Sequence, residues 1–278
     1  MGHYNGRVSD ANAPVGVFDS GLGGLSVLRE IQRLLPAEHV LYYGDSGHCP
    51  YGGRPPEYIL GRSTAVTNFL VERGAKIIVV ACNTATSVCI PELRARFSIP
   101  IVAMAPAVKP AAAATRSGKI GVLATPRTVT GESLAALIRE HARDTEVYPM
   151  PAPGLVELVE AGKLSGPEVE DALRPLLGPL LEKGVDTIVL GCTHYPFLRD
   201  AICDLAGPGL AIIDSGEAVA RRTRDVLTRQ GLLRPGSGQG RLELFTSGTA
   251  EHVGQVASRL LGEKVTVAHA AVPPDVSI

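Results

Sequence analysis

LVERGAKIIVVACNT (residues 70–84) and LLEKGVDTIVLGCTH (residues 180–194) are two copies of one pattern, 110 positions apart. In each copy a charged segment ends at a glycine, an apolar run follows, and the run ends at a cysteine. These cysteines are Cys82 in the first copy and Cys192 in the second. Internal repetition of this kind is typical of two related structural units. The sequence therefore predicts two similar halves, each placing one thiol at the end of an apolar strand.

A second pair of segments supports this division. VGVFDS (15–20) and IGVLAT (120–125) align at an offset of 105, so each half begins with a strand that ends in a hydroxyl residue. If the halves face each other, Cys82 and Cys192 approach one cleft from opposite sides. A reaction that needs a base on one face of a carbon and an acid on the other requires such a pair. Isolated cysteines are often simply buried in cores, but equivalent positions in a repeat favour a functional role.

The composition excludes several classes of protein. The 278 residues carry a net charge of −1, which argues against nucleic acid as the primary partner. The longest apolar runs, such as IIVVAC (77–82), are far too short to span a membrane, and the first ten residues do not resemble a signal peptide. Five cysteines without a CxxC pair fit a reducing compartment. We expect a soluble cytoplasmic protein.

Short β-branched runs alternate with helical patterns from Val15 to about residue 270, which favours an α/β fold. We expect two pseudo-symmetric domains, each a mainly parallel sheet covered by helices, with the active site in the cleft between them. The strands are predicted at 15–19, 39–43, 77–81, 100–103, 120–124, 145–148, 186–190, 210–213, 241–246 and 265–267.

The domain boundaries follow from the repeat and from the segments that join its halves. Residues 14–104 together with 214–278 are predicted to form the first domain and residues 105–213 the second, after a flexible tail at 1–13. Ligands of parallel sheets bind beyond the carboxyl ends of the strands. Asp19, Ser20 and Thr125 fall at such ends, as do both cysteines.

DSGLGG (19–24) follows a strand and opens a helix, so its backbone amides could bind an anion. Its glycine spacing is not that of a dinucleotide-binding fingerprint. The alternative is a turn in which Ser20 caps the helix. Asp19 is the more informative residue, because a carboxylate at a strand end can orient an ammonium group or relay a proton.

The loop GDSGHCPYGGRPPEY (44–58) is long and rich in glycine and proline, as functional loops often are. Pro50, Tyr51 and Gly52 would restrict its path and present backbone amides to a carboxylate. Cys49 and His48 suggest a nucleophile and its base, but neighbouring residues of an extended chain point to opposite sides.

CNTATS (82–87) and CTHYP (192–196) carry the strongest chemical signal. A helix is expected after each cysteine, and its N-terminal dipole would lower the thiol pKa. Side chains next to the cysteines supply hydrogen-bond donors for a carboxylate, namely Asn83, Thr84 and Thr193. His194 is expected to polarise a thiol, or else to be a packed histidine. Glu160 is a candidate proton relay, with a solvated helix face as the alternative.

Metal and pyridoxal chemistry are not supported by the sequence. Cys82 and Cys89 are seven positions apart, Cys192 and His194 form only a pair, and neither spacing is that of a metal site. No lysine lies in the motifs to form a Schiff base with pyridoxal phosphate. We therefore predict no cofactor and no metal.

The motifs resemble those of glutamate racemases, which belong to the cofactor-independent aspartate/glutamate racemase superfamily. The resemblance rests on six segments spread over most of residues 15–220, and it is most specific where ACNTAT occurs together with GCTHYP. The matching segments are VGVFDSGLGGLSVL (15–28), YYGDSGHCPYG (42–52), VVACNTAT (79–86), VLATPRT (122–128), LVELVE (155–160) and GCTHYPFL (191–198).

The resemblance implies interconversion of L- and D-glutamate, which supplies D-glutamate for peptidoglycan. Cys82 and Cys192 become the two acid/base thiols, assisted by Asp19, His194 and Glu160. The substrate-binding residues that it implies are Asp19, Ser20, Pro50, Tyr51, Gly52, Asn83, Thr84, Thr125, Thr128, Thr193 and His194. The expected partner is glutamate, and a homodimer stays open.

Three positions depart from the family pattern. His48 stands in place of a common arginine, Ala124 in place of a glycine and Ala152 in place of a cysteine. An aspartate racemase with the same paired thiols is an alternative within the superfamily, whereas a related decarboxylase would need only one thiol. A binding role is a further alternative, since some glutamate racemases bind DNA gyrase.

Overall fold

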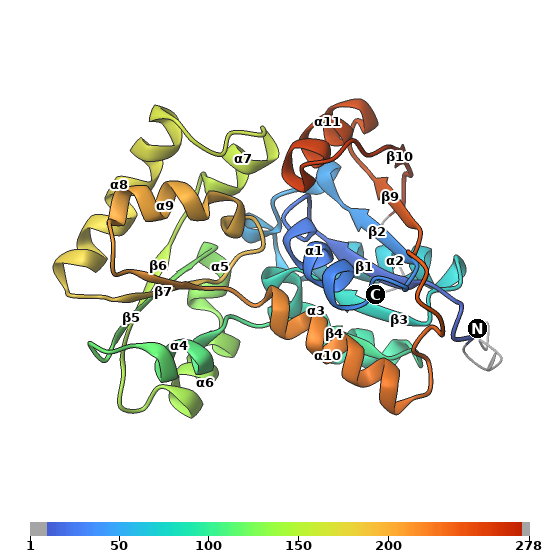
Figure 1. Cartoon of the computed structure of the whole chain (residues 1–278), viewed down its shortest axis with the longest axis horizontal. Coiled ribbons are helices and arrows are strands. Elements are labelled where there is room, and N and C mark those ends of the chain that lie inside the picture. The colour runs from blue at the N-terminus through green and yellow to red at the C-terminus, as the bar shows by residue number, and fades with distance from the viewer. Residues whose placement is uncertain (1–9, 274–278) are drawn as a thin grey trace.

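Two parallel β-sheets, each covered by helices, form two lobes that lie side by side in the computed structural model (Figure 1). The structure describes residues 10–273. Most of the predicted tail at 1–13 lies outside the described residues. Its described end forms a turn in which the Ala13 N–H donates to the Asp10 carbonyl over 2.9 Å. The α/β fold with two sheets, predicted from the alternation of strands and helices, is confirmed.

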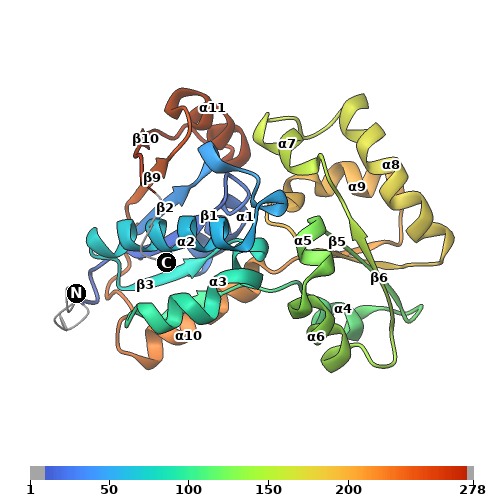
Figure 2. The ribbon, with the colours of Figure 1, turned by 180° about the vertical axis from the view of Figure 1, so that it is seen from behind.

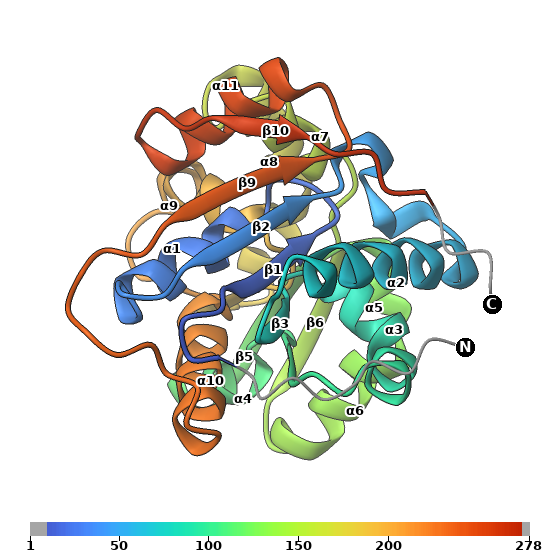
Figure 3. The ribbon, with the colours of Figure 1, turned by 90° about the vertical axis from the view of Figure 1, so that its right-hand side faces the viewer.

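Within residues 10–273, ten strands occur where ten were predicted, with ends shifted by at most three residues, and every pairing is parallel. The first sheet has the order β10 (Val267–His269), β9 (Leu242–Thr246), β2 (Val40–Gly44), β1 (Val15–Asp19), β3 (Ile77–Val80), β4 (Ile101–Ala103) (Figure 3). The second has the order β6 (Glu146–Pro151), β5 (Lys119–Ala124), β7 (Thr187–Leu190), β8 (Ala211–Ile213). The central strands β1, β3 and β7 are buried along their whole length. Continuous apolar runs are what strands covered by helices on both faces require.

Helices from separate parts of the chain pack around each sheet (Figures 1 and 2). Those of the first lobe are α1 (Leu25–Leu34), α2 (Pro56–Glu72), α3 (Asn83–Arg96), α10 (Gly216–Arg229) and α11 (Ala250–Leu261). Those of the second are α4 (Val108–Ala114), α5 (Pro126–Thr130), α6 (Glu132–His141), α7 (Leu155–Glu160), α8 (Pro167–Glu182) and α9 (Arg199–Ala206). Helix α1 shows why they pack, because Leu25, Leu28 and Ile31 recur at helical spacing and are fully buried.

The chain passes between the sheets twice. It leaves the first sheet after β4 and returns after β8, and β9 then pairs with β2. The two passages meet where the Ser215 hydroxyl donates to the Ala105 carbonyl over 2.6 Å. These crossings lie at the segments from which the domain boundaries were predicted, and the boundaries themselves stay a prediction.

Parallel pairing brings several strand ends to one place. Asp19 at the end of β1 is in register with Gly44 of β2, and β3 continues through Ala81 into Cys82. In the second sheet β5 leads into Thr125 and β7 into Cys192. Over residues 10–273, no helix is long and apolar enough to cross a membrane.

Candidate active site

A small cavity lies between the strand ends of the two sheets and holds both repeat cysteines. Its lining residues are Ser20, Pro50, Tyr51, Gly52, Cys82, Asn83, Thr84, Thr125, Val156, Cys192, Thr193 and His194. The cavity volume is about 10 Å³, roughly the space that one water molecule needs. Eleven of these twelve residues were predicted from the sequence, and Val156 was not. The cavity therefore unites both copies of the repeat.

Cys82 is the N-cap residue of α3, and its surroundings keep the thiol protonated. Its Sγ accepts the Ala85 N–H over 3.4 Å and lies 3.7 Å from the Ser20 hydroxyl. Burial, and then the negative charge of Asp19, raise the pKa of Cys82 well above its usual value in spite of these donors. The predicted lowering of this thiol pKa by the helix N-terminus is therefore wrong for Cys82, because desolvation and a neighbouring carboxylate outweigh the helix.

Cys192 has a different neighbour. Its Sγ lies 3.7 Å from Nδ1 of His194, whose Nε2 lies 2.7 Å from Oε1 of Glu160. Burial opposes a charged imidazole, yet the sulfurs of Cys192 and Cys49 and the Glu160 carboxylate raise the pKa of His194 well above its usual value. These contacts favour an imidazolium beside Cys192. The chain after Cys192 forms a turn and the 3₁₀ helix η3 (Tyr195–Leu198), so the predicted α-helix start at this cysteine is wrong.

The Glu160 contact fixes which nitrogen of His194 carries hydrogen. A carboxylate only accepts, so Nε2 must donate, and the Gly23 N–H at 3.2 Å from the same nitrogen cannot use it as an acceptor. Nδ1 is therefore free to take a proton from Cys192. Glu160 itself is held by the Leu22 N–H at 2.6 Å and by the Ser46 hydroxyl at 3.4 Å. Burial disfavours its charge, but these bonds and His194 lower the pKa of Glu160.

Asp19 is fully buried and, although predicted to bind substrate, does not line the cavity. Its Oδ2 accepts the Gly24 N–H over 2.7 Å and the Thr193 hydroxyl over 3.2 Å, while Oδ1 accepts the Ser20 hydroxyl over 3.3 Å. This carboxylate touches residues of both lobes. Its carboxylate also neighbours the Cys82 thiol.

Hydroxyl groups and one amide form the opposite wall. The Thr84, Thr125 and Thr128 hydroxyls follow one another at 3.0 Å spacing, although Thr128 does not line the cavity. Asn83 is buried, and neither its amide nitrogen nor its carbonyl oxygen has a partner among the described residues. Unpaired buried polar atoms are costly, so the Asn83 amide is available to a polar ligand.

The glycine-rich loop closes the cavity from a third side. The Cys49–Pro50 peptide bond is cis, and the 3₁₀ helix η2 (Tyr51–Gly53) follows it. The Tyr51 hydroxyl donates to Asp45 over 2.5 Å. Asp45 in turn forms a fully buried ion pair of 2.8 Å with Arg62 of α2. This pair anchors the loop, and η1 (Ser46–His48) begins beside it.

The three departures from the family pattern lie outside the cavity lining. The His48 ring contacts the Tyr58 hydroxyl at 2.6 Å, Ala124 packs in the core, and the Ala152 carbonyl accepts the Tyr195 hydroxyl over 2.8 Å. The Cys49 sulfur lies beside His194 and Glu160, a contact that was not predicted from the sequence. The position of Cys49 in the glycine-rich loop (44–58) indicated a functional site, but its contacts with His194 and Glu160 depend on how the second lobe packs against this loop.

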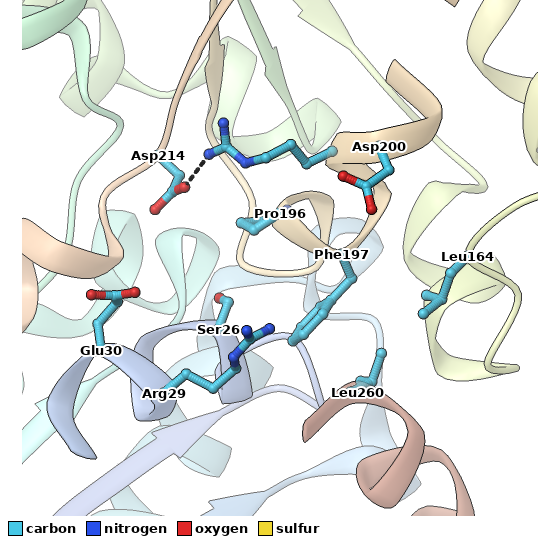
Figure 4. A pocket seen from close by; sticks show the side chains of 10 residues that line it. Ser26, Arg29, Glu30, Leu164, Pro196, Phe197, Asp200, Asp214 and Leu260 are labelled. Carbon is cyan, nitrogen blue, oxygen red and sulfur yellow. Dashed lines mark hydrogen bonds and ion pairs between the residues drawn. The ribbon is translucent and has the colours of Figure 1, made fainter. Parts of the chain in front are cut away.

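A larger cavity of about 470 Å³ lies elsewhere between the lobes (Figure 4). It is lined by Ser26, Arg29 and Glu30 of α1 and by Pro196 and Phe197 of η3, among other residues. None of the predicted catalytic residues lines it. We place the chemistry in the smaller cavity, because the paired thiols and their partners are there.

We predict that Gly23→Ala lowers kcat about 100-fold, since a displacement of about 1 Å in catalytic geometry has an effect of that size. A Cβ at Gly23 would lie 2.3 Å from Nδ1 of His194 and 2.6 Å from the Thr193 hydroxyl, so His194 would have to move away from Cys192. Steady-state kinetics would measure the loss. Gly53→Ala is the control, because nothing lies within 4 Å of its Cβ position. Equal kcat in both variants would contradict this account of His194.

The raised pKa of His194 also predicts that the stability of the protein depends on pH. Its pKa is raised in the folded protein, so its contribution to stability is fully present below about pH 6.5, its ordinary pKa, and is lost as the pH rises through the folded value. The difference in unfolding free energy between the wild type and His194→Gln should therefore shrink from pH 6 to alkaline pH. Urea unfolding measures it, and a difference that grows with pH would contradict the direction.

Known proteins match this chain along most of its length. Residues 15–223 match the model of the Asp/Glu/Hydantoin racemase family. A glutamate racemase from Herpetosiphon aurantiacus is 52% identical over 243 residues, covering 87% of this chain and 96% of the relative. The crystal structure of a Bacillus anthracis glutamate racemase has a TM-score of 0.84 at 32% identity, covering 95% of this chain and all of that one.

The structure of Escherichia coli glutamate racemase in complex with L-glutamate and the activator UDP-MurNAc-Ala has a TM-score of 0.83 at 37% identity. It covers 94% of this chain and 99% of the other. The fold, the paired cysteines of the repeat and the similarity to these proteins all indicate the same family. The chain therefore belongs to the Asp/Glu/Hydantoin racemase family, among its glutamate racemases.

Proposed function

We propose that this racemase interconverts L- and D-glutamate by a two-base proton transfer between Cys82 and Cys192, and that its product is D-glutamate for peptidoglycan. The observation that supports this most is that the two thiols line one cavity from different sheets. The relatives that are about half identical to the chain bear the name of this activity. No cofactor takes part in the proposed reaction.

The two thiols have unequal surroundings, and these suggest their starting states. His194 stabilises a thiolate at Cys192, while burial and Asp19 keep Cys82 protonated. Cys192 then removes the α-proton from one enantiomer and Cys82 gives its proton to the opposite face. The α-carbon loses its proton to Cys192 and gains another from Cys82, so its hydrogen count is the same at the end, and the thiolate lies on Cys82 instead of Cys192. The roles reverse for the other enantiomer, with Asp19 and His194 exchanging protons with their thiols.

The α-proton of an amino acid is weakly acidic, so the site must stabilise the charge that develops on the substrate. The Asn83 amide has no partner among the described residues, and with the Thr84 and Thr125 hydroxyls it offers neutral donors to the substrate carboxylates, whereas the Ser20 and Thr193 hydroxyls donate to Asp19. A cavity of about 10 Å³ is too small for glutamate. The lobes must therefore move apart to admit it and close again to exclude water.

Incubation of L-glutamate with the protein in D₂O tests both the reaction and its mechanism. Two separate bases predict that D-glutamate carries an α-deuteron from the start, while the remaining L-glutamate keeps its α-proton at early times. Proton NMR with chiral analysis of the same sample distinguishes these pools. Early D-glutamate that retains the substrate proton would contradict two bases. Folded protein that converts aspartate but not glutamate would overturn the substrate assignment.

A further inference from the structure

Cys49, Glu160 and His194 form a cluster that the proposed proton transfer does not fully use. They come from the loop after β2, the end of α7 and the loop after β7, so folding brings together residues far apart in sequence. One sulfur, one ring nitrogen and one carboxylate oxygen all lie within 4.8 Å of one another. Cys49 has no role in the racemisation described above.

The donor set is the one that zinc prefers. Thiolate, imidazole and carboxylate are all zinc ligands, and sites with three protein ligands leave a fourth position for water. The cluster is not sealed from solvent, because the Glu160 side chain keeps 19% of its surface exposed. A cation can therefore reach the carboxylate first and then the buried His194.

We propose that Cys49, Glu160 and His194 bind Zn²⁺ and that the bound ion inhibits the enzyme. The inhibitory part rests on the proposed racemisation, whereas the binding part does not.

The His194–Glu160 edge of the site needs only a small rearrangement. Two ligands at the usual 2.0–2.1 Å bond lengths in a tetrahedral site lie about 3.3 Å apart, and Nε2 of His194 is 2.7 Å from Oε1 of Glu160. The carboxylate must therefore withdraw by well under 1 Å. The Cys49 thiol and the Nε2–H of His194 each release a proton to solvent as the ion binds.

Inhibition follows from the place of His194 in the site. With the metal on Nε2, Nδ1 carries the hydrogen of the neutral ring and faces the Cys192 sulfur at 3.7 Å. A neutral ring that already carries hydrogen on Nδ1 cannot take up the proton that Cys192 gains from the substrate, so the thiolate at Cys192 is not restored for the next turnover. The metal therefore separates Cys192 from its base, and Glu160 can no longer hold the ring through a hydrogen bond.

Titration of the purified protein with Co²⁺, a spectroscopic substitute for Zn²⁺, tests binding without reference to catalysis. We expect a thiolate-to-cobalt absorption band that Zn²⁺ displaces. Cys49→Ala should abolish the band, and Glu160→Gln, which keeps all five thiols, should weaken Co²⁺ affinity by at least about 10- to 100-fold. Cys203→Ala, which removes an exposed thiol, and Cys82→Ala, which removes a reacting thiol, should retain the band.

Zn²⁺ inhibition is then measured for each active variant relative to its own metal-free rate. We expect inhibition of the wild type and Cys203→Ala, reversal by EDTA, and insensitivity of Cys49→Ala. No band in the wild type, or an undiminished band in Cys49→Ala or Glu160→Gln, would overturn the site. A band lost in Cys82→Ala would place the ion on the reacting thiols instead. A protein that binds Co²⁺ but never racemises glutamate would refute the proposed function and leave the metal site standing.

Discussion

Replacing either Cys82 or Cys192 by serine is expected to lower kcat for glutamate racemisation by about 10²- to 10⁴-fold, the usual contribution of a positioned acid or base. A serine hydroxyl is a far weaker acid than a thiol. It therefore stays protonated and cannot act as the base, and it gives up its proton slowly when it must act as the acid. Both cysteines are buried at the cavity, and serine keeps their approximate size. Circular dichroism of the glutamate pool measures the rate in both directions.

The two variants should also differ from each other. Each keeps one thiol, which can still exchange the α-proton of the enantiomer that it faces. Incubation in D₂O should therefore show residual exchange of opposite enantiomers in Cys82→Ser and Cys192→Ser. Cys89→Ser is the matched control, because Cys89 is buried in α3 beside the Ser63 hydroxyl at 3.5 Å and does not line the cavity. Normal racemisation by both single variants would refute the two-thiol mechanism.

Much of this site could be predicted because the chemistry lies at strand ends. The repeat placed Cys82 and Cys192 after equivalent apolar strands, and the carboxyl ends of parallel strands necessarily lie at one edge of a sheet. Apolar runs such as IIVV (77–80) are strong local signals, which is why the ten strands could be predicted to within a few residues. The assignment of individual side chains depended on the resemblance to a family.

What the sequence could not predict depends on contacts between distant segments. Cys49 meets His194 and Glu160 only because the loop after β2 faces the second lobe. The raised pKa of Cys82 comes from complete burial and from Asp19, 63 positions earlier, whereas the local pattern suggested only a helix N-terminus. The turn after Cys192 was missed because CTHYP and CNTATS look equivalent, although Tyr195 and Pro196 begin a 3₁₀ helix.

Breaking the buried ion pair between Arg62 and Asp45 is expected to have a large effect on the stability of the protein. We expect Arg62→Leu to lower the free energy of unfolding by about 3–5 kcal/mol, the usual result of leaving one buried charge without its partner. The two side chains are 1% and 0% exposed, and Asp45 also accepts the hydroxyls of Tyr51 and Ser247. Urea unfolding measures the loss. Arg33→Leu is the control, since Arg33 is exposed and its partners Glu30 and Glu217 are half-buried and exposed, so the expected change is about 0–1 kcal/mol.

A double-mutant cycle separates the ion pair from other effects of the substitution. Asp45→Asn removes the charge that Arg62→Leu leaves unpaired, so the double variant should lose less stability than the sum of the two single variants. Additive losses would show that the charges do not interact. The same pair holds the loop that carries Tyr51 and Gly52 against the cavity. Arg62→Leu should therefore raise KM for glutamate under conditions where the variant stays folded, because a loosened loop binds substrate less well while the thiols keep their own partners.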